Sequence, residues 1–525
     1  MSRPNLLFIQ TDQQKARSLD LYSDVNAIDT ANIRRIADEG VVFDNGYCPL
    51  PLCVPSRISM LTGLYPSASG YVGNKPYPMG DRYPTLFSAA RRDGYRTMLV
   101  GKDHAIGLPG HAKWEPTGAI AQTFDRIYSA WHGGKMNPEI NRDLPHIEPF
   151  LQGTPELQTL WGSAVAPWSS DTSISARLSD VAVEYLSDWR RDDKPSGTPF
   201  AMWLSYPDPH EFYQAPRDVV DMIDPSSIEL PPNWECDMSD RAEFIQYFHW
   251  YFNAGGVPED VARKLIRIYL AMCKNVDMVV GRVLDYLQDN GEWQNTIIVY
   301  TSDHGDFNGE MQLLQKFNAG YDGCCRVPLI VAYPGHSRRG ARCDDPVNLV
   351  DIPSTLMPWM ELEPLPGDQG RPFADALTSD AFDPRTYTVV ESGVPGESLT
   401  RRDIANFPDH RWNVTPEGRW CYDPPHRFGG KMYAVRTRDF KLIVRQDQRH
   451  EFYDYRVDPW ETRNRVDDAS LQGDVLRHYQ YLAQHVARIA PNPPGTEIAP
   501  QDAFYRAGGD ATWAASLAAS RSSSR

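Results

Sequence analysis

The stretch NTIIVYTSDHG, Asn295 to Gly305, is a short apolar run that ends abruptly in an aspartate and a histidine. Three further segments have this form: NLLFIQTD, YRTMLVGKDH and PFAMWLSYPDPH. Continuous apolar runs of this length are typical of strands buried on both faces, as in a parallel sheet. Ligands of such sheets bind beyond the carboxyl ends of the strands, so the polar residues there are expected to converge. These residues are Asp12, Lys102, His104, His210, Asp303 and His304.

Helical patterns lie between the four runs, at residues 30–41, 83–94, 174–192 and 261–291. The last pattern ends in Asn-Gly, which is a helix-stop signal. Strands that alternate with helices predict an α/β fold, in which a large, mostly parallel mixed sheet lies between layers of helices.

The composition of the sequence changes near residue 365, where proline and glycine become frequent. The segments 386–393, 431–446 and 450–458 then alternate between apolar and polar residues, as half-buried antiparallel strands do. A helix is expected near 470–489. We therefore predict an α/β catalytic domain, a smaller C-terminal α+β subdomain with an antiparallel sheet, and a flexible tail. Their ranges are 1–380, 381–500 and 501–525.

The bulk composition argues against several classes of function. The chain has 525 residues and a formal net charge of −16, so attraction to nucleic-acid backbones is not expected, and an anionic substrate would need a local cluster of cations. We read no export signal and no apolar run of about eighteen residues, so no membrane partner is expected. The eight cysteines show no CxxC spacing, and reduced thiols in the cytoplasm are the expected state.

Two of the strand-end motifs place candidate metal ligands side by side. Gln13 follows Asp12, and His304 follows Asp303. Two carboxylates, an amide oxygen and an imidazole suit a single divalent cation. Either motif by itself is better explained as a polar turn, but the two at equivalent strand ends favour a metal site.

A further pattern surrounds Cys53, in the stretch CPLPLCVPSRISMLTG from Cys48 to Gly63. Proline is well tolerated in the first turn of a helix, so a helix is expected to begin here. Its N-terminus would offer backbone donors to an anion, with Arg57 one turn further on, and would lower the pKa of the thiol. Most free cysteines are small buried hydrophobes, and that interpretation prevails for Cys53 unless other motifs support a function.

Several motifs, in order along the chain, supply that support. CVPSRISMLTG matches the sulfatase signature C-x-P-S-R-x-x-x-L-T-G, and GYRTMLVGKDH (94–104) resembles the second signature of that family. IQTDQQ and TSDHGD resemble its two metal segments, and FYDYRVDPWETRN (452–464) is similar to its C-terminal LYDL..DP.E..N segment. From residue 5 to about 464 the chain thus resembles the type I sulfatases of the alkaline phosphatase superfamily.

The resemblance implies an alkaline-phosphatase-like fold and the hydrolysis of a sulfate ester. In this family a formylglycine-generating enzyme reads the Pro-Ser-Arg segment and oxidises the cysteine to formylglycine, whose hydrate attacks sulfur and expels the alcohol. The hemiacetal left behind then collapses and releases sulfate, whereas a serine nucleophile would leave a sulfate ester that needs direct hydrolysis. Cys53 would be the modified residue here.

The resemblance also implies roles for individual residues. Arg57 is expected to hold the modified cysteine, Lys102 to bind a sulfate oxygen, and His104 to assist the diol. His210 and Lys316 match, on shorter motifs, the residues near the leaving-group oxygen and the ester anion. For Lys102 and His104 the plainer alternatives are a solvated loop lysine and a structural histidine. The residues that match metal ligands are Asp12, Gln13, Cys53, Asp303 and His304.

Departures from the family pattern leave the ion and the substrate open. The common sulfatase site has three aspartates and an asparagine or glutamine, whereas Gln13 and His304 occupy two of those places here. Calcium is the family default and manganese the alternative, since imidazole is a softer ligand. This ligand set, with glutamine and histidine in two places, resembles that of the phosphonate monoester hydrolases. A phosphonate monoester or phosphodiester hydrolase is therefore the main alternative. An inactive binding protein on this scaffold ranks low, because every expected catalytic residue is present.

These motifs do not determine the alcohol part of the substrate, which is expected to be a small-molecule or carbohydrate sulfate ester. Asn74 is either a substrate contact or an ordinary turn asparagine. The segments 411–431 and 129–137 are candidate rims of the pocket. Aromatic and arginine side chains in the first would suit a sugar or an anionic group, and a plain surface loop is equally expected. Assembly into a homo-oligomer is left open.

Overall fold

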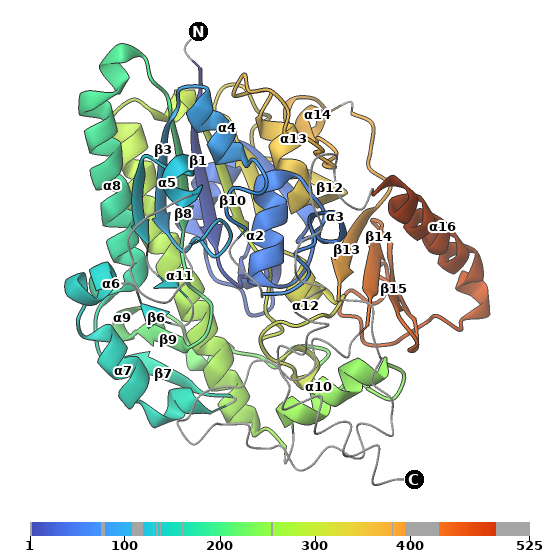
Figure 1. Ribbon diagram of the computed structural model, residues 1–525. Helices are drawn as coiled ribbons and strands as arrows, with labels where there is room; N and C mark the ends of the chain where they lie inside the picture. Colours follow the sequence, from blue (N-terminus) through green and yellow to red (C-terminus); the bar gives the residue numbers. More distant parts are fainter. Residues whose placement is uncertain are drawn as a thin grey trace, which may run out of the picture.

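A large mixed sheet forms the centre of the computed structural model (Figure 1). In spatial order its strands are β12 (Ala341–Asn348), β2 (Gly40–Tyr47), β11 (Leu329–Ala332), β10 (Thr296–Ser302), β1 (Asn5–Thr11), β8 (Phe200–Ser205), β3 (Arg96–Gly101) and β4 (Arg126–Ser129). The structure describes residues 3–74, 79–107, 119–129, 138–159, 161–253, 256–380, 382–393 and 430–489, with the backbone of 131–132 and 135–136.

The four strands predicted from apolar runs are β1, β3, β8 and β10. They are neighbours in the order β10-β1-β8-β3, and they run parallel. Every residue of β1, β8 and β10 is buried, which explains why these strands are apolar without alternation. The register pairs Thr11 with Ser302 and Gly101 with Ser205, so the segments that follow these strands start at one edge of the sheet.

Helices cover both faces of this sheet. α8 (Ile174–Asp192), α11 (Glu259–Asp289) and α1 (Ala31–Asp38) pack together on one face, while α2 (Cys53–Thr62), α4 (Leu86–Arg92) and α13 (Ile352–Leu356) lie on the other (Figure 1). The four predicted helices and the helix at Cys53 are all present. After α11, Gly291 has a φ of 71°, the left-handed conformation that its Asn-Gly signal predicts.

The remaining described elements are short connections around these layers. The helices are α3 (Pro66–Ser69), α5 (Ala119–Thr123), α6 (Pro138–Asp143), α7 (Ile147–Gly153), α9 (Arg217–Val220), α10 (Glu243–Asn253), α12 (Asp322–Cys325) and α14 (Ala374–Thr378). Two strand pairs, β5 (Trp131–His132) with β6 (Lys135–Met136) and β7 (Ser163–Ala166) with β9 (Tyr213–Pro216), lie apart from the large sheet. Among the described residues, no helix is both long and apolar enough to cross a membrane.

Half of the large sheet has no clear sequence signal. β2 follows α1 after Glu39, so the predicted helix at 30–41 overlapped its first residues. β11 is four residues long and runs antiparallel to both β10 and β2. β12 is an edge strand whose register shifts between Cys343 and Pro346, and its sequence is largely polar for that reason.

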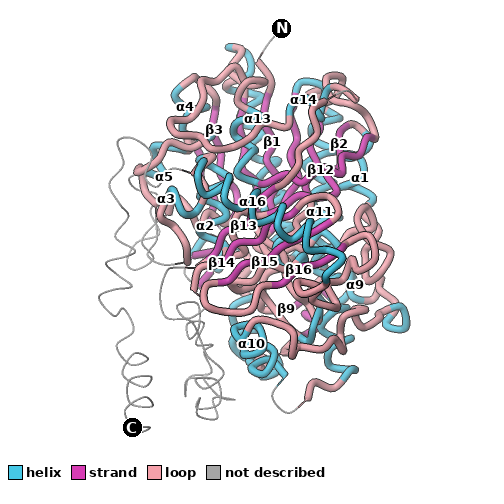
Figure 2. Tube along the Cα trace, turned by 90° about the vertical axis from the view of Figure 1, so that its right-hand side faces the viewer, coloured by secondary structure: helices cyan, strands magenta, loops and turns pink. Residues whose placement is uncertain are grey.

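A second, antiparallel sheet follows, with the order β13 (Thr388–Ser392), β14 (Met432–Arg436), β15 (Phe440–Arg445) and β16 (Glu451–Asp454). α16 (Gln472–Arg488) lies across its strands (Figure 2). Sequence alternation predicted that these strands are half-buried, but nearly all of their residues are buried. The reason is that both faces are covered: Phe440 and Leu442 pack towards α16, whereas Ile443 and Ala434 belong to the main core.

Candidate active site

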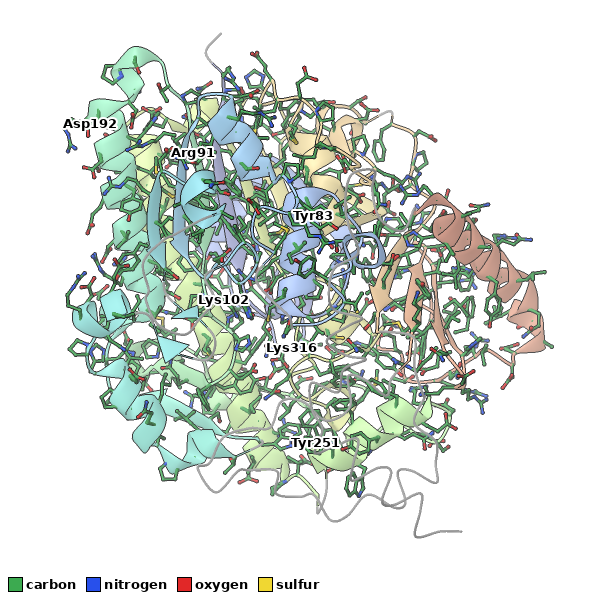
Figure 3. The ribbon with its side chains drawn as sticks, viewed as in Figure 1. Tyr83, Arg91, Lys102, Asp192, Tyr251 and Lys316 are labelled. Carbon is green, nitrogen blue, oxygen red and sulfur yellow. The ribbon has the colours of Figure 1, made fainter. Side chains whose placement is uncertain are left out.

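The ends of the four parallel strands carry the polar residues that the sequence singled out. Asp12 follows β1, Asp303 follows β10, and Lys102 follows β3. Gly101 is required at the end of β3, since a Cβ there would lie 1.9 Å from the carbonyl oxygen of Ser205. Lys102 lies in the middle of the view in Figure 3, and its Nζ is 4.0 Å from the sulfur of Cys53 at the start of α2.

Four buried side chains converge at this edge: Asp12, Cys53, Asp303 and His304. One ligand atom from each lies within 4.8 Å of the others, and none of the four side chains is more than 1 % exposed. Cys53 Sγ is 3.2 Å from His304 Nε2 and 3.9 Å from Asp12 Oδ1. The cysteine therefore belongs to the same cluster as the candidate metal ligands.

Arg57 holds the two carboxylates in place from within α2. Its Nε donates to Asp303 Oδ2 at 2.7 Å, and its Nη2 donates to Asp12 Oδ2 at 2.8 Å. Its Nη1 donates to the carbonyl oxygen of Lys102 at 2.8 Å and to Ser205 Oγ at 2.9 Å. A guanidinium has five N–H donors in a fixed plane, so one side chain can tie together the ends of four strands.

Lys102 and His104 approach Cys53 from the β3 side. Lys102 Nζ lies 2.5 Å from Asp12 Oδ2 and 4.0 Å from Cys53 Sγ. His104 hydrogen-bonds to the Cys53 side chain. His104 has a φ of 49° and Gln13 a φ of 69°, so both belong to the non-glycine residues whose backbone is left-handed.

Lys316 and His210 form the opposite wall. Lys316 Nζ donates to Gln13 Oε1 at 2.5 Å and to His210 Nε2 at 2.7 Å, and it lies 3.3 Å from Glu211 Oε1. The Gln13 amide is oriented by its other end, because Nε2 donates to Asp306 Oδ2 at 2.6 Å. His210 Nε2 is 4.0 Å from Asp12 Oδ1, so this wall faces the metal-ligand cluster.

Asn74 contacts the start of α2. Its Oδ1 accepts a hydrogen bond from the backbone N–H of Val54, the residue after Cys53, at 3.1 Å. The first turn of a helix has N–H groups without helical partners, and Asn74 satisfies one of them.

The charges of the cluster favour the ionised form of the Cys53 thiol and disfavour the ionised form of Asp303. Burial raises the pKa of Cys53, but Lys102, Lys316 and His304 more than offset this and place it well below 9. Burial and the charge of Asp12 raise the pKa of Asp303. Burial lowers the pKa of His304, but Asp303 and Cys53 outweigh it and raise the value to about 9.

The donor set fits a divalent cation. Two buried carboxylates that face each other are stabilised by a further positive charge, and oxygen donors with one imidazole suit calcium or manganese. Gln13 is placed differently from the other candidate ligands, since its Oε1 already accepts from Lys316. An ion that took this oxygen would compete with the ammonium group.

A shallow pocket that is partly open to solvent adjoins the cluster on the side of Lys102 and His210. Its apolar wall is formed by Leu151, Ile174 and Phe212. The pocket therefore places an apolar surface beside the cationic groups of the site. The candidate rim at 411–431 lies, except for its last two residues, outside the described residues, as do several residues of 129–137 and the whole tail 501–525.

Sequence reasoning missed four residues that complete this site. Ser205 accepts from Arg57, Asp306 orients Gln13, Tyr213 donates to Asp306 Oδ2 at 2.6 Å, and Glu211 contacts Lys316. Two of them adjoin residues that were found, in SDHGD and in DPHEF. A carboxylate so close to a catalytic motif is a signal that could have been used.

Comparison with known proteins identifies the family of this chain. The Sulfatase family model matches residues 4–362. The chain belongs to the sulfatase family. It is 29 % identical over 497 residues to the uncharacterized sulfatase YidJ of Escherichia coli K12, covering 93 % of this chain and 88 % of that one. It is 27 % identical over 541 residues to an N-acetylglucosamine-6-O-sulfatase of Bacteroides thetaiotaomicron, covering 94 % and 88 %.

The fold of this sulfatase is shared with solved structures. The phosphonate monoester hydrolase of Silicibacter pomeroyi superposes with a TM-score of 0.73 at 22 % identity, covering 93 % of this chain and 96 % of that one. At this identity the likeness establishes the fold, which is the α/β architecture that the sequence predicts, with its separate antiparallel sheet.

Proposed function

We propose that this sulfatase hydrolyses sulfate esters through a formylglycine derived from Cys53, with one divalent cation. The main support for this proposal is the position of Cys53 at the start of α2. Its Sγ lies 3.2 Å from His304 Nε2 and 4.0 Å from Lys102 Nζ. A nucleophile in this position is surrounded by cations that would hold a sulfate group against it.

The roles of the chain's own residues follow from their contacts. Arg57 fixes the two aspartates, so that the nucleophile and its charge environment are set before substrate arrives. Lys102 and Lys316 stabilise negative charge on the sulfate oxygens, and His210 lies with Lys316 on the side where the alcohol departs. His104 is hydrogen-bonded to the side chain of Cys53. It is therefore placed to accept the hydroxyl proton of the hemiacetal, whose removal releases sulfate.

Asp12, Gln13, Asp303 and His304 would hold the cation beside the modified Cys53. The ion would supply Lewis-acid stabilisation of charge at the nucleophile, and calcium is favoured over manganese because it is the usual ion of the family that the motifs resemble. The formylglycine-generating enzyme is the partner required for maturation. A cytoplasmic location and assembly into oligomers stay predictions.

Peptide mass spectrometry tests the nucleophile. The tryptic peptide that ends at Arg57 should carry an aldehyde or its hydrate in place of the Cys53 thiol when the protein is produced with a formylglycine-generating enzyme. The purified protein should then turn over 4-nitrophenyl sulfate, and turnover should rise with the converted fraction. Full conversion without turnover of any sulfate or phosphonate ester would leave the inactive binding protein as the explanation.

A phosphonate or phosphate diester hydrolase is the second candidate, because Gln13 and His304 replace two members of the common sulfatase ligand set and the chain shares its fold with a phosphonate monoester hydrolase. Rates on matched aryl sulfate and aryl phosphonate esters separate the two activities. A kcat/KM higher for the sulfate supports the proposal, and the reverse order replaces it.

The relatives act on different alcohols, among them N-acetylglucosamine carrying a 6-O-sulfate and choline. We propose a small-molecule or carbohydrate sulfate ester as the substrate, since the pocket beside Lys102 combines an apolar wall with polar groups. A panel of sulfated monosaccharides, choline sulfate and alkyl sulfates would assign the alcohol.

A further inference from the structure

Glu211 contacts both Lys316 and His210, the two residues of the wall opposite Lys102, although no motif marks it. Its carboxylate lies 3.3 and 3.4 Å from Lys316 Nζ, and its backbone carbonyl oxygen is 2.7 Å from His210 Nδ1. Its side chain is 12 % exposed and lines the pocket beside Lys102 and His210. One residue therefore contacts the lysine through its carboxylate and the histidine through its backbone carbonyl and its carboxylate, whose Oε2 lies 3.4 Å from His210 Nδ1.

The proton positions in this wall follow from the donors. A lysine ammonium has donors and no acceptor, so the 2.7 Å contact with Lys316 Nζ makes His210 Nε2 an acceptor. The ring proton then lies on Nδ1 and is donated to the carbonyl oxygen of Glu211. With its contacts to Gln13, His210 and Glu211, the Lys316 ammonium has a partner for each of its three hydrogens.

We propose that Glu211 is a positioning residue that aims Lys316 at the departing alcohol oxygen and fixes His210 beside it. The inference rests on the proposed function of the site. When a sulfate oxygen approaches Lys316, one of the three contacts must be released, and the contact to Glu211 is the longest of them. The carboxylate thus keeps the ammonium oriented before substrate binds and weakens sulfate binding in return, because it is a negative charge beside an anion site.

These opposite effects define the test. Glu211→Gln keeps the shape of the side chain and removes its charge. We expect the kcat for aryl sulfates to fall by about 10- to 100-fold, since misaimed catalytic groups cost rates on this scale. We expect the affinity for inorganic sulfate, measured by calorimetry, to rise by about tenfold. A purely structural role would lower both quantities.

The dependence on the leaving group sharpens the assignment. In a series of aryl sulfates of decreasing phenol acidity, Glu211→Gln should lose most rate on the poorest leaving groups, because these need the most help from Lys316. Glu211→Asp should recover part of the loss. Glu229→Gln, the same change at an exposed position, is the matched control. It should have the same activity and sulfate affinity as the enzyme without substitutions.

Two results would overturn the inference: an equal loss of kcat/KM across the series with weaker sulfate binding, or an unchanged kcat. If the enzyme turns over aryl phosphonates and not sulfates, the proposed function fails, and the same series is run with phosphonates. If it turns over neither, the calorimetry decides, since tighter sulfate binding by Glu211→Gln supports the contact to Lys316 and unchanged binding refutes it.

Discussion

Asp303 in the active site and Asp322 between the two sheets are both buried aspartates, yet their surroundings differ. Asp322 Oδ1 accepts from Lys441 Nζ at 2.5 Å and from the hydroxyl groups of Tyr47 and Tyr455. Burial raises the pKa of Asp322, but Lys441 and the arginines around it hold the value well below its usual range. Asp303 instead faces a second carboxylate, and its pKa is raised.

The difference shows which cluster is complete within the chain. Lys441 also binds Glu461 Oε1 at 2.8 Å, so the Asp322 cluster has its own central cation and joins β15 to the large domain. In the active site Arg57 bridges Asp12 and Asp303, yet burial and the charge of Asp12 still raise the pKa of Asp303. The first arrangement stabilises the fold, and the second creates a place for a ligand.

The largest effect on activity is expected when the nucleophile is removed. Cys53→Ala should lower the kcat for 4-nitrophenyl sulfate by about 10⁴-fold or more, since loss of a catalytic nucleophile has effects on this scale. The free energy of unfolding should change by about 1 kcal/mol or less, because Cys53 is not part of the ion pairs that hold the site. Cys236→Ala is the matched control, and a variant at Cys53 that retains activity would refute the assigned role.

Removing the central cation of the other cluster should have the opposite signature. Lys441→Met leaves Asp322 and Glu461 buried without their lysine and should lower the free energy of unfolding by about 3–5 kcal/mol in urea titrations. Lys264→Met, at an exposed position of α11, should change it by about 0.5 kcal/mol or less. Equal effects of the two variants would contradict a structural role for the Asp322 cluster.

The sequence revealed these two clusters to different extents. The active site was predictable because Asp12, Lys102 and Asp303 directly follow apolar strands, and such runs are recognised without knowledge of distant contacts. Glu461 lies in the recognised segment 452–464, but its pairing with Lys441 depends on how the second sheet packs and has no local signal. The same limit applies to β11, which is four residues long, and to β12, which is largely polar, whereas β2 begins directly after α1 and its first residues were included in the predicted helix.

A third test uses Asp208, a half-buried carboxylate beside the active site that accepts from Ser175 Oγ at 2.5 Å. Burial raises its pKa from 3.8 to about 6. The folded state therefore disfavours the charged form, and this cost is absent below pH 3.8 and complete above pH 6. Asp208→Asn should be more stable than the unmodified protein by up to about 3 kcal/mol at pH 8, with the difference shrinking as the pH falls towards 4.

Urea titrations at pH 5 and pH 8 check the sign of this effect. Asp180→Asn, the same change at a half-exposed aspartate of α8 that is paired with Arg282, is a suitable comparison. It should not reproduce the pH-dependent gain in stability of Asp208→Asn, because a surface ion pair contributes about 0–1 kcal/mol. A gain for Asp208→Asn that is the same at both pH values would show that burial of charge is not its cause.

The smallest expected effect concerns the ion itself. If the facing carboxylates of the active site receive a divalent cation, calcium at a hundredfold excess over its dissociation constant should raise the free energy of unfolding by about 2.7 kcal/mol, and a chelator should reverse the gain. Lys441→Met should keep this increment despite its lower stability, since the Asp322 cluster already holds its own cation. Asp303→Asn should lose it. A gain that survives in Asp303→Asn would place the ion elsewhere, and the contrast between a complete and an incomplete charge cluster would no longer explain why the two aspartates differ.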